Sequence, residues 1–266
     1  MSRLRVLVVA ASADIGAYLV EHYLGLGAQV VGTYRNHTSR MAELERSGAI
    51  LLPLDISSPE SVSDFAQKLL KRNYTWDVLI SAVGLLEPIG PFFSTDFNDW
   101  ENSVITNSTA QLRMLHAVHP FRKREGLAKV IFFAGGGTNG TFDNYSAYCV
   151  GKLSLIKMTE LLDSECSYLQ ISIIGTGWVN TKIHQQTIKA AKAAGLNFTR
   201  TQEFITSGAQ GASLKDVSEC VDWCLNAPRA AVGGRNFSLV HDKWRDPGFI
   251  DTLIANPGSY KLRRLS

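Results

Sequence analysis

Short apolar runs alternate with longer segments of helical period along most of this chain, and this alternation limits the fold more than any other feature. The runs are rich in Val, Ile and Leu, as are the strands of a parallel sheet that is buried on both faces. Seven runs are predicted to be strands: Leu4–Ala10, Ala28–Tyr34, Ala49–Asp55, Asp77–Val83, Ala128–Ala134, Leu169–Gly175 and Arg235–Val240.

Parallel strands cannot be joined by tight turns, so each pair needs a crossover segment. The predicted crossover helices are Ile15–Leu26, Ser39–Ser47, Pro59–Arg72, Asp99–Phe121, Tyr145–Cys166 and Leu214–Asn226. The sequence therefore predicts an α/β fold over residues 1–266, a single-domain doubly wound parallel sheet of about seven strands with helices on both faces. The segment Lys182–Gly211 interrupts the alternation where a substrate lid is expected, and residues 241–266 form a C-terminal extension.

The charges of the 266 residues nearly balance, with 27 Lys and Arg against 24 Asp and Glu and a formal net charge of +3. This balance argues against a protein that binds nucleic acid or a membrane surface through charge. No apolar run reaches the roughly 18 residues of a membrane-spanning helix. The four cysteines form neither a disulfide framework nor a cluster of metal ligands, so a reduced, cytoplasmic protein without a metal site is expected.

The loop after the first predicted strand reads Ala10-Ala11-Ser12-Ala13-Asp14-Ile15-Gly16. Small residues there let backbone N–H groups approach a pyrophosphate at the N-terminus of the next helix, where the helix dipole favours negative charge. Two of the three glycines of such loops are absent, with Ala10 and Asp14 in their places. The loop is consistent with dinucleotide binding, but it is a weak signal by itself.

The second predicted strand ends in Tyr34-Arg35-Asn36, without the acidic residue that accepts a hydrogen bond from the ribose 2′-OH of NAD. Arg35 is placed to pair with a 2′-phosphate instead, so NADP(H) is the predicted cofactor. A solvent-exposed loop arginine is the alternative. Asp55 ends the third predicted strand. It either accepts from the adenine amino group or caps the following turn.

Tyr148 and Lys152 lie four residues apart in the predicted helix Tyr145–Cys166, so their functional ends share one helix face. They follow the fifth predicted strand and three consecutive glycines, residues 135–137. This is the carboxyl edge of the sheet, where doubly wound folds bind their ligands. The position of the pair, more than its spacing, indicates a role in chemistry. A half-buried aromatic residue is the alternative for Tyr148.

These features, in this order, resemble the short-chain dehydrogenase/reductase family over roughly residues 4–240. The resemblance implies a Rossmann-type fold, a nicotinamide cofactor, and a homodimer or homotetramer formed through the two long predicted helices. It implies that Tyr148 is the general acid/base and that Lys152 lowers its pKa and holds the nicotinamide ribose. Asn107 matches the family's helix-kinking Asn, which holds a water in a proton relay; a solvent-facing helical Asn is the alternative.

Two further segments are similar to the family's cofactor site. Ser81-Ala82-Val83-Gly84 stands where the family usually has Asn-Asn-Ala-Gly. In Gly175-Thr176-Gly177-Trp178-Val179-Asn180-Thr181, Val179 and Thr181 are expected to hold the nicotinamide carboxamide, and a structural turn is the alternative. The complete set of predicted cofactor-binding residues is Ala10, Ser12, Asp14, Ile15, Gly16, Tyr34, Arg35, Asn36, Asp55, Ile56, Ala82, Gly84, Tyr148, Lys152, Val179 and Thr181.

One departure from the family pattern bears on catalysis. The family's Ser, which hydrogen-bonds the substrate carbonyl oxygen, lies about 13 residues before the Tyr, and this chain has Gly135 there. Loss of such a donor can add about 3 kcal/mol to a reaction barrier. Thr138 is the nearest candidate substitute, and a donor from the substrate or from the loop backbone is the other alternative.

The sequence thus predicts an NADP(H)-dependent oxidoreductase that interconverts a carbonyl and an alcohol of a small molecule by hydride transfer, with Tyr148 as general acid/base. The main alternative is an NADP(H)-binding relative with little or no activity, because Gly135 replaces the Ser. Nucleotide-sugar epimerases share the Tyr and Lys but usually add a C-terminal substrate domain, for which this chain is expected to be too short.

The substrate expectation depends on weaker likenesses. Residues 144–148 and 234–244 resemble bacterial family members associated with surface-polysaccharide sugars. A sugar-related substrate is therefore expected. Trp178, Lys182 and His184 are candidates for its pocket, and an exposed amphipathic lid is the alternative for this region.

Overall fold

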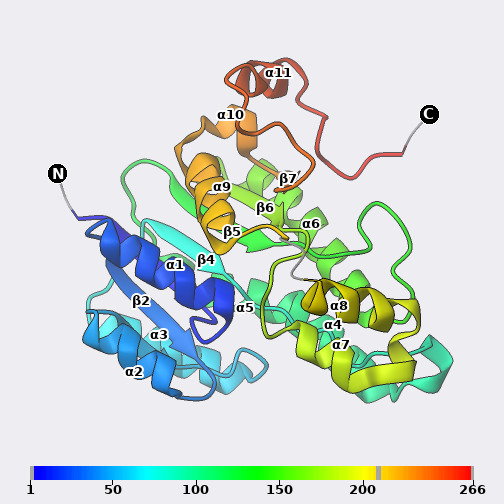
Figure 1. Ribbon diagram of the computed structural model, residues 1–266. Coiled ribbons are helices and arrows are strands. Elements are labelled where there is room, and N and C mark those ends of the chain that lie inside the picture. The colour runs from blue at the N-terminus through cyan, green and yellow to red at the C-terminus, as the bar shows by residue number, and fades with distance from the viewer. Residues whose placement is uncertain (1–2, 208–210, 265–266) are drawn as a thin grey trace.

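Seven parallel strands form one sheet in the computed structural model, which describes residues 3–207 and 211–264 (Figure 1). The strands are β1 (Arg5–Val9), β2 (Gln29–Tyr34), β3 (Ile50–Pro53), β4 (Val78–Ser81), β5 (Ala128–Phe133), β6 (Leu169–Gly175) and β7 (Arg235–Ser238). Their spatial order is β3-β2-β1-β4-β5-β6-β7. Strand order therefore reverses between β1 and β4, and such a switch point leaves a crevice at the carboxyl ends of the strands.

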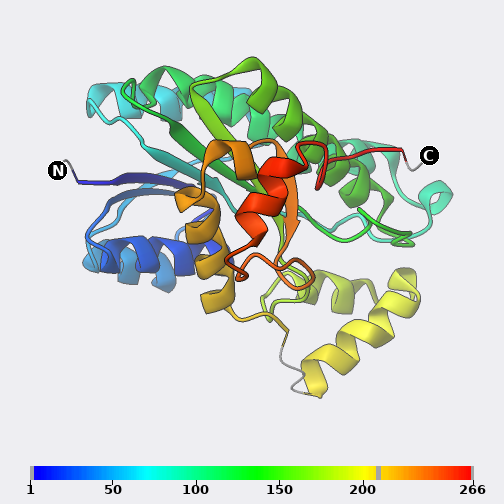
Figure 2. The same cartoon turned by 90° about the horizontal axis from the view of Figure 1, so that it is seen from above.

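Helices cover both faces of the sheet (Figure 2). One apolar core lies under α1 (Asp14–Gly25), α2 (Ser39–Arg46), α9 (Leu214–Asn226), α10 (Arg229–Val232) and α11 (Phe249–Ala255). A second core lies under α3 (Pro59–Lys71), α5 (Thr109–Val118) and α6 (Ser146–Glu165) on the opposite face. The predicted doubly wound parallel sheet is confirmed.

The prediction of one continuous helix over Asp99–Phe121 is wrong. The chain forms α4 (Phe97–Asn107), then α5, then a short 3-10 turn η2 (His119–Phe121). Ser108 separates α4 from α5 with φ −134° and ψ −89°, outside the helical region. Asn107 Nδ2 donates to the Ser103 carbonyl at 3.0 Å, and Gln111 Nε2 donates to the Asn107 carbonyl at 3.1 Å. Side-chain amides from both sides of the break thus bind backbone carbonyls of α4.

The segment after β6 folds over the carboxyl edge of the sheet. It contains α7 (His184–Ala190), the 3-10 turn η3 (Ala191–Ala194) and α8 (Leu196–Thr206), which pack on one another (Figure 1). The Tyr145 hydroxyl lies 2.8 Å from Thr187 Oγ1, and Asn197 Nδ2 donates to the Asp143 carbonyl at 3.0 Å. We call residues 182–206 the lid segment. The predicted lid extends to residue 211, and residues 208–210 of it lie outside the described residues.

The C-terminal extension packs on the same domain. Arg235, buried in β7, donates to the Leu253 and Asn256 carbonyls at the end of α11, at 2.6 and 3.2 Å. Trp244 and Phe249 are buried in the core under α9. No helix among residues 3–207 and 211–264 has both the length and the apolar character required to cross a bilayer.

Candidate active site

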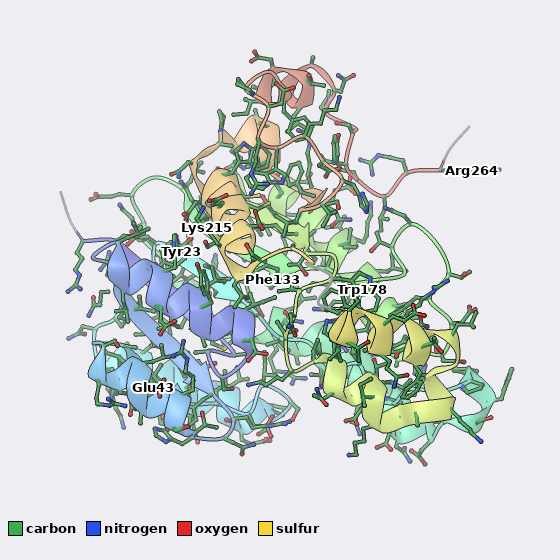
Figure 3. All side chains as sticks on the ribbon, viewed as in Figure 1. Tyr23, Glu43, Phe133, Trp178, Lys215 and Arg264 are labelled. Atoms are coloured by element: carbon green, nitrogen blue, oxygen red, sulfur yellow. The ribbon has the colours of Figure 1, made fainter. Side chains whose placement is uncertain are left out.

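A cavity of about 1020 Å³ opens at the carboxyl edge, between the loops that follow β1, β4, β5 and β6 and the lid segment. It brings together these predicted site residues: Asp14, Ile15, Ala82, Gly84, Thr138, Tyr148, Lys152, Val179 and Thr181. Trp178, Lys182 and His184 also line it, and Figure 3 shows Trp178 beside α8 and Phe133 at the sheet. Within the described residues, no cluster of three or more His, Cys, Asp or Glu side chains is arranged to hold a metal ion.

The loop after β1 keeps a tight turn even though two of its glycines are replaced. Ala10 has φ 63°, in the left-handed region that costs a non-glycine residue about 1–2 kcal/mol. Its N–H donates to Thr33 Oγ1 at 3.0 Å, which holds the turn against β2. A Cβ on Gly16 would lie 2.1 Å from the Ala10 carbonyl oxygen, so only glycine fits there. The backbone path, rather than the number of glycines, is what this loop retains.

The predicted cofactor-binding residues at the end of β2 and just after it lie outside the cavity lining. Tyr34 is half-buried, and Arg35 and Asn36 are exposed. The nearby Arg40 guanidinium pairs with Glu21 and Glu43, at 2.6 and 2.9 Å. Within residues 3–207 and 211–264, the Arg35 guanidinium makes no hydrogen bond or ion pair, so it is a free cation at the carboxyl end of β2.

The contacts of Asp55 agree with the alternative that its side chain caps the turn after β3. Asp55 Oδ1 accepts from the Ser57 N–H at 3.0 Å and from the Ser57 hydroxyl at 2.6 Å, which caps the turn after β3. Its neighbour Ile56 and the distant Ala10 are both partly buried and pack on the core under α3. None of these three residues lines the cavity.

Tyr148 and Lys152 lie in the first turns of α6, and both side chains are buried, at 8% and 2% exposure. Lys152 Nζ donates to the Val83 and Phe133 carbonyls, each at 2.8 Å, which ties α6 to the ends of β4 and β5. Nζ lies 5.9 Å from the centre of the Tyr148 ring. Burial raises the pKa of the Tyr148 phenol above its usual value and lowers the pKa of the Lys152 ammonium to about 7.

Asn107 is buried at the end of α4, so the alternative of a solvent-facing helical Asn is wrong. Its Oδ1 accepts from the Leu85 N–H at 3.1 Å, and its Nδ2 donates to the Leu85 carbonyl at 2.7 Å. Gly151 lets α4 and α6 approach closely here, since a Cβ on Gly151 would lie 2.7 Å from Asn107 Cβ. Asn107 thus holds the loop after β4 close to α4 and α6, and α6 carries Tyr148.

Gly135 leaves space that the Tyr148 ring occupies. A Cβ on Gly135 would lie 1.9 Å from the Tyr148 hydroxyl oxygen, so a serine could not be added without moving the tyrosine. Thr138 lines the same cavity, but its Oγ1 donates to the Gly135 carbonyl at 3.0 Å. The hydroxyl of Thr138 is therefore already used within its own loop.

Residues that follow β6 add contacts to the site, among them Gln186, which the sequence did not single out. Gln186 Oε1 accepts from the Leu86 and Glu87 N–H groups at 2.8 and 3.3 Å. Lys182 N–H donates to Asp14 Oδ2 at 2.6 Å, a contact that spans 168 residues of sequence. The Trp178 ring stacks on His184, with centroids 5.2 Å apart and an interplanar angle of 9°. Burial lowers the pKa of His184, which favours the neutral imidazole.

The chain is similar to known proteins in sequence and in fold. The family model described as short chain dehydrogenase matches residues 5–192. A curated relative, the 2-dehydro-3-deoxy-D-gluconate 5-dehydrogenase of Bacillus subtilis, is 27% identical over 191 residues, covering 66% of this chain and 70% of the relative. A short-chain dehydrogenase/reductase from Saccharomyces cerevisiae matches with a TM-score of 0.79 at 19% identity, covering 93% of this chain and 98% of that chain.

A further solved structure, a short-chain dehydrogenase from Shigella flexneri complexed with NADP, has a TM-score of 0.73 at 20% identity, covering 90% of this chain and 98% of that chain. These solved structures share the fold of the present chain. The family match runs from β1 into the lid segment and includes Tyr148 and Lys152. The protein therefore belongs to the short-chain dehydrogenase/reductase family, whose members are oxidoreductases that bind a nicotinamide cofactor.

Proposed function

We propose that this protein is an NADP(H)-dependent oxidoreductase that interconverts a carbonyl compound and an alcohol, with Tyr148 as general acid/base. The observation that carries the proposal is the position of Tyr148 and Lys152. Both are buried, and both line the cavity that also contains Asp14 and Ile15 of the loop after β1. A proton donor and a neighbouring amine thus share a crevice with the loop that is expected to hold phosphate.

The residues present fit a nicotinamide dinucleotide. The cavity of about 1020 Å³ is large enough for a cofactor. Gly84 presents its backbone there, and the nearest atom to a Cβ added on it is Ile183 Cδ1 at 3.4 Å. The loop of residues 10–16, Gly84, Lys152, Val179 and Thr181 would hold the cofactor. When bound, its nicotinamide ring supplies or accepts the hydride.

The free guanidinium of Arg35 supports NADP(H) rather than NAD(H), because it is available to a 2′-phosphate. The Shigella flexneri structure with NADP is consistent with this choice. Arg35→Ala is expected to weaken NADPH binding about tenfold and to leave NADH binding nearly unchanged, as a lost charged hydrogen bond would. Arg40→Ala is the control, since Glu21 and Glu43 already pair with Arg40. Equal loss of NADPH and NADH binding in Arg35→Ala would contradict the assignment.

The neutral phenol of Tyr148 suits the reduction direction in this conformation. Because burial raises the pKa of Tyr148, the phenol is neutral at pH 7 and can donate a proton to a carbonyl oxygen as it becomes an alcohol. Protonated Lys152, 5.9 Å from the ring centre, favours the phenolate that the reverse direction needs. We propose that Asn107 has the role that the family resemblance implies, holding a water in a proton relay, while its side chain holds the loop after β4.

The cavity wall supports the proposal of a hydroxylated, sugar-related substrate. We propose that this substrate belongs to bacterial surface-polysaccharide metabolism. Hydroxyl and amide side chains line the wall: Thr138, Asn139, Thr141, Thr187, Asn197 and Thr201. The name of the Bacillus subtilis relative gives a sugar acid, 2-dehydro-3-deoxy-D-gluconate, as that protein's substrate. Polar groups of this kind orient a ligand by hydrogen bonds.

We further propose a cytoplasmic homodimer or homotetramer that pairs through α4, α5 and α6. Val150 and Leu161 on α6 are apolar and exposed, at 43% and 39%. Burial of such residues between two copies would remove apolar surface from water. Sedimentation of the purified protein tests this proposal, and a monomer at micromolar concentration would contradict it.

Replacement of Tyr148 by Phe tests the proposed reaction. Tyr148→Phe is expected to reduce turnover of a responsive carbonyl or alcohol substrate by about a thousandfold or more, since the proton-transfer group is lost. NADPH affinity, measured by fluorescence titration, is expected to stay within about twofold of wild type because the ring is retained. Unchanged turnover in Tyr148→Phe would overturn the mechanism.

Gly135 favours a second candidate, an NADP(H)-binding protein with little or no turnover. No side-chain hydroxyl exists at residue 135, and the hydroxyl of Thr138 is bound to the Gly135 carbonyl. A broad panel of sugar-related carbonyls and alcohols separates the two candidates. NADPH binding without turnover of any compound would favour the second one.

A further inference from the structure

Lys182, the first residue of the lid segment, contacts the loop after β1 at three points. Its N–H donates to Asp14 Oδ2 at 2.6 Å, and its ammonium lies 3.7 Å from Asp14 Oδ1. The ammonium also donates to the Ser12 carbonyl. Both Asp14 and Lys182 line the cavity. The lid segment is thereby attached to the part of the site that is expected to bind phosphate.

Asp14 is an unusual residue for a loop of this kind. It is the first residue of α1 and replaces one of the glycines of the dinucleotide-binding pattern. A carboxylate at a helix N-terminus is favourable in the free protein, because it complements the helix dipole. It becomes unfavourable when phosphate groups enter the same crevice, because like charges then lie close together. A nearby cation would remove this penalty.

We propose that Lys182 is a positioning residue that closes the lid segment onto the loop after β1 and neutralises Asp14, so that this loop can accept the phosphates of the dinucleotide. The inference depends on the proposed NADP(H) function. In this arrangement the contact between Lys182 and Asp14 both closes the lid segment and allows the loop after β1 to accept phosphate.

Other contacts of the lid segment involve the loops after β4 and β5. Gln186 binds the N–H groups of Leu86 and Glu87, and Thr187 binds Tyr145. These contacts hold α7 against the loops after β4 and β5. Lys182 extends the attachment across the crevice to α1. Loss of its ammonium is therefore expected to loosen this end of the lid segment while α7 stays attached.

A double-mutant cycle between Asp14 and Lys182 tests the proposal. The variants are Lys182→Met, Asp14→Gly and the double variant, with Lys182→Arg as the conservative variant. Lys192→Met is the control, because Lys192 is an exposed lysine on the same segment. Each protein is titrated with NADPH by fluorescence. Each ligand-free protein is also digested with chymotrypsin, which does not cut at lysine, to follow cleavage of residues 182–206.

Lys182→Met is expected to weaken NADPH binding about fivefold and to speed ligand-free cleavage of the lid segment by a similar factor, as loss of a partly exposed ion pair would. In the Asp14→Gly background the same change is expected to alter NADPH affinity less than about twofold. Lys182→Arg and Lys192→Met are expected to resemble wild type. The effect of Lys182→Met is expected to shrink as salt concentration rises.

Equal weakening of NADPH binding in both backgrounds would overturn the neutralisation of Asp14. Unchanged chymotrypsin cleavage in Lys182→Met would overturn the closure of the lid segment. If no protein binds NADPH, the proposed cofactor function fails and the neutralisation with it. The ligand-free digestion then still supports or overturns closure by Lys182.

Discussion

The loops after β1 and β5 both depart from the family pattern, but they depart in opposite directions. After β1, glycines have been lost, with Ala10 and Asp14 in their places. After β5, a glycine has been gained, with Gly135 in place of the usual serine. The first loop keeps its backbone path, with Ala10 at φ 63°. The second loop loses a hydroxyl, and the Tyr148 ring occupies the space beside it.

The difference follows from what each loop contributes to the site. The loop after β1 offers backbone N–H groups, so a changed side chain is tolerated where the turn survives and its charge is balanced. The loop after β5 would offer a side-chain donor, and a glycine at residue 135 has no hydroxyl to offer. Departures are therefore expected to affect stability and cofactor affinity on the β1 side, and turnover on the β5 side.

Of the changes in these two loops, Gly135→Ser is expected to have the largest effect, and its failure would contradict the comparison. Gly135→Ser restores the family residue, yet it is expected to lower turnover about a hundredfold, because its Cβ would displace the Tyr148 hydroxyl. Gly140→Ala is the control in the same loop, since a Cβ there meets no heavy atom within 4 Å. Initial rates and unfolding temperatures of both variants check this. A gain of turnover in Gly135→Ser would show that Tyr148 and a serine at residue 135 are compatible.

On the β5 side, the stability of the protein is expected to depend on pH through Lys152. The buried ammonium of Lys152 destabilises the folded protein below neutral pH. The folded-state pKa is about 7, against an ordinary value of 10.5, so the unfolded chain binds more protons between these values. Wild-type stability relative to Lys152→Met is therefore expected to rise by about 2 kcal/mol from pH 7 to pH 9.

Urea unfolding at several pH values measures this difference. Lys157→Met is the control, because Lys157 lies on the same helix and pairs with Glu160 at 2.8 Å. Its stability is expected to follow the wild-type pH profile. A constant difference between wild type and Lys152→Met across this range would show that Lys152 stays charged in the folded protein.

The smallest expected effect lies on the β1 side. Ala10→Gly is expected to raise the free energy of unfolding by about 1 kcal/mol, because glycine adopts a positive φ without the steric penalty. Ala11→Gly is the control, because Ala11 is fully buried, and its loss of packing is expected to lower stability. A destabilised Ala10→Gly would mean that the turn carries no strain.

Local pattern was sufficient for most of the architecture. Each strand is a short apolar run between helical segments, as a parallel sheet buried on both faces requires. The same patterns placed Tyr148 and Lys152 on one face of α6, since the helical repeat brings residues four apart together. The break at Ser108 was missed, because side-chain amides of Asn107 and Gln111 compete there with the helix. The helices of the lid segment and the C-terminal extension were not predicted either.

The site depended on contacts that no local pattern records. The Asp14–Lys182 contact joins residues 168 positions apart, and the fit of Tyr148 beside Gly135 depends on how α6 docks on β5. The sequence by itself determined the sheet, the helices and the placement of the candidate chemistry at one edge, because these follow from periodicity within short segments. Tertiary structure alone decided which charges pair and which spaces are filled, because both depend on atoms that packing brings together from distant segments.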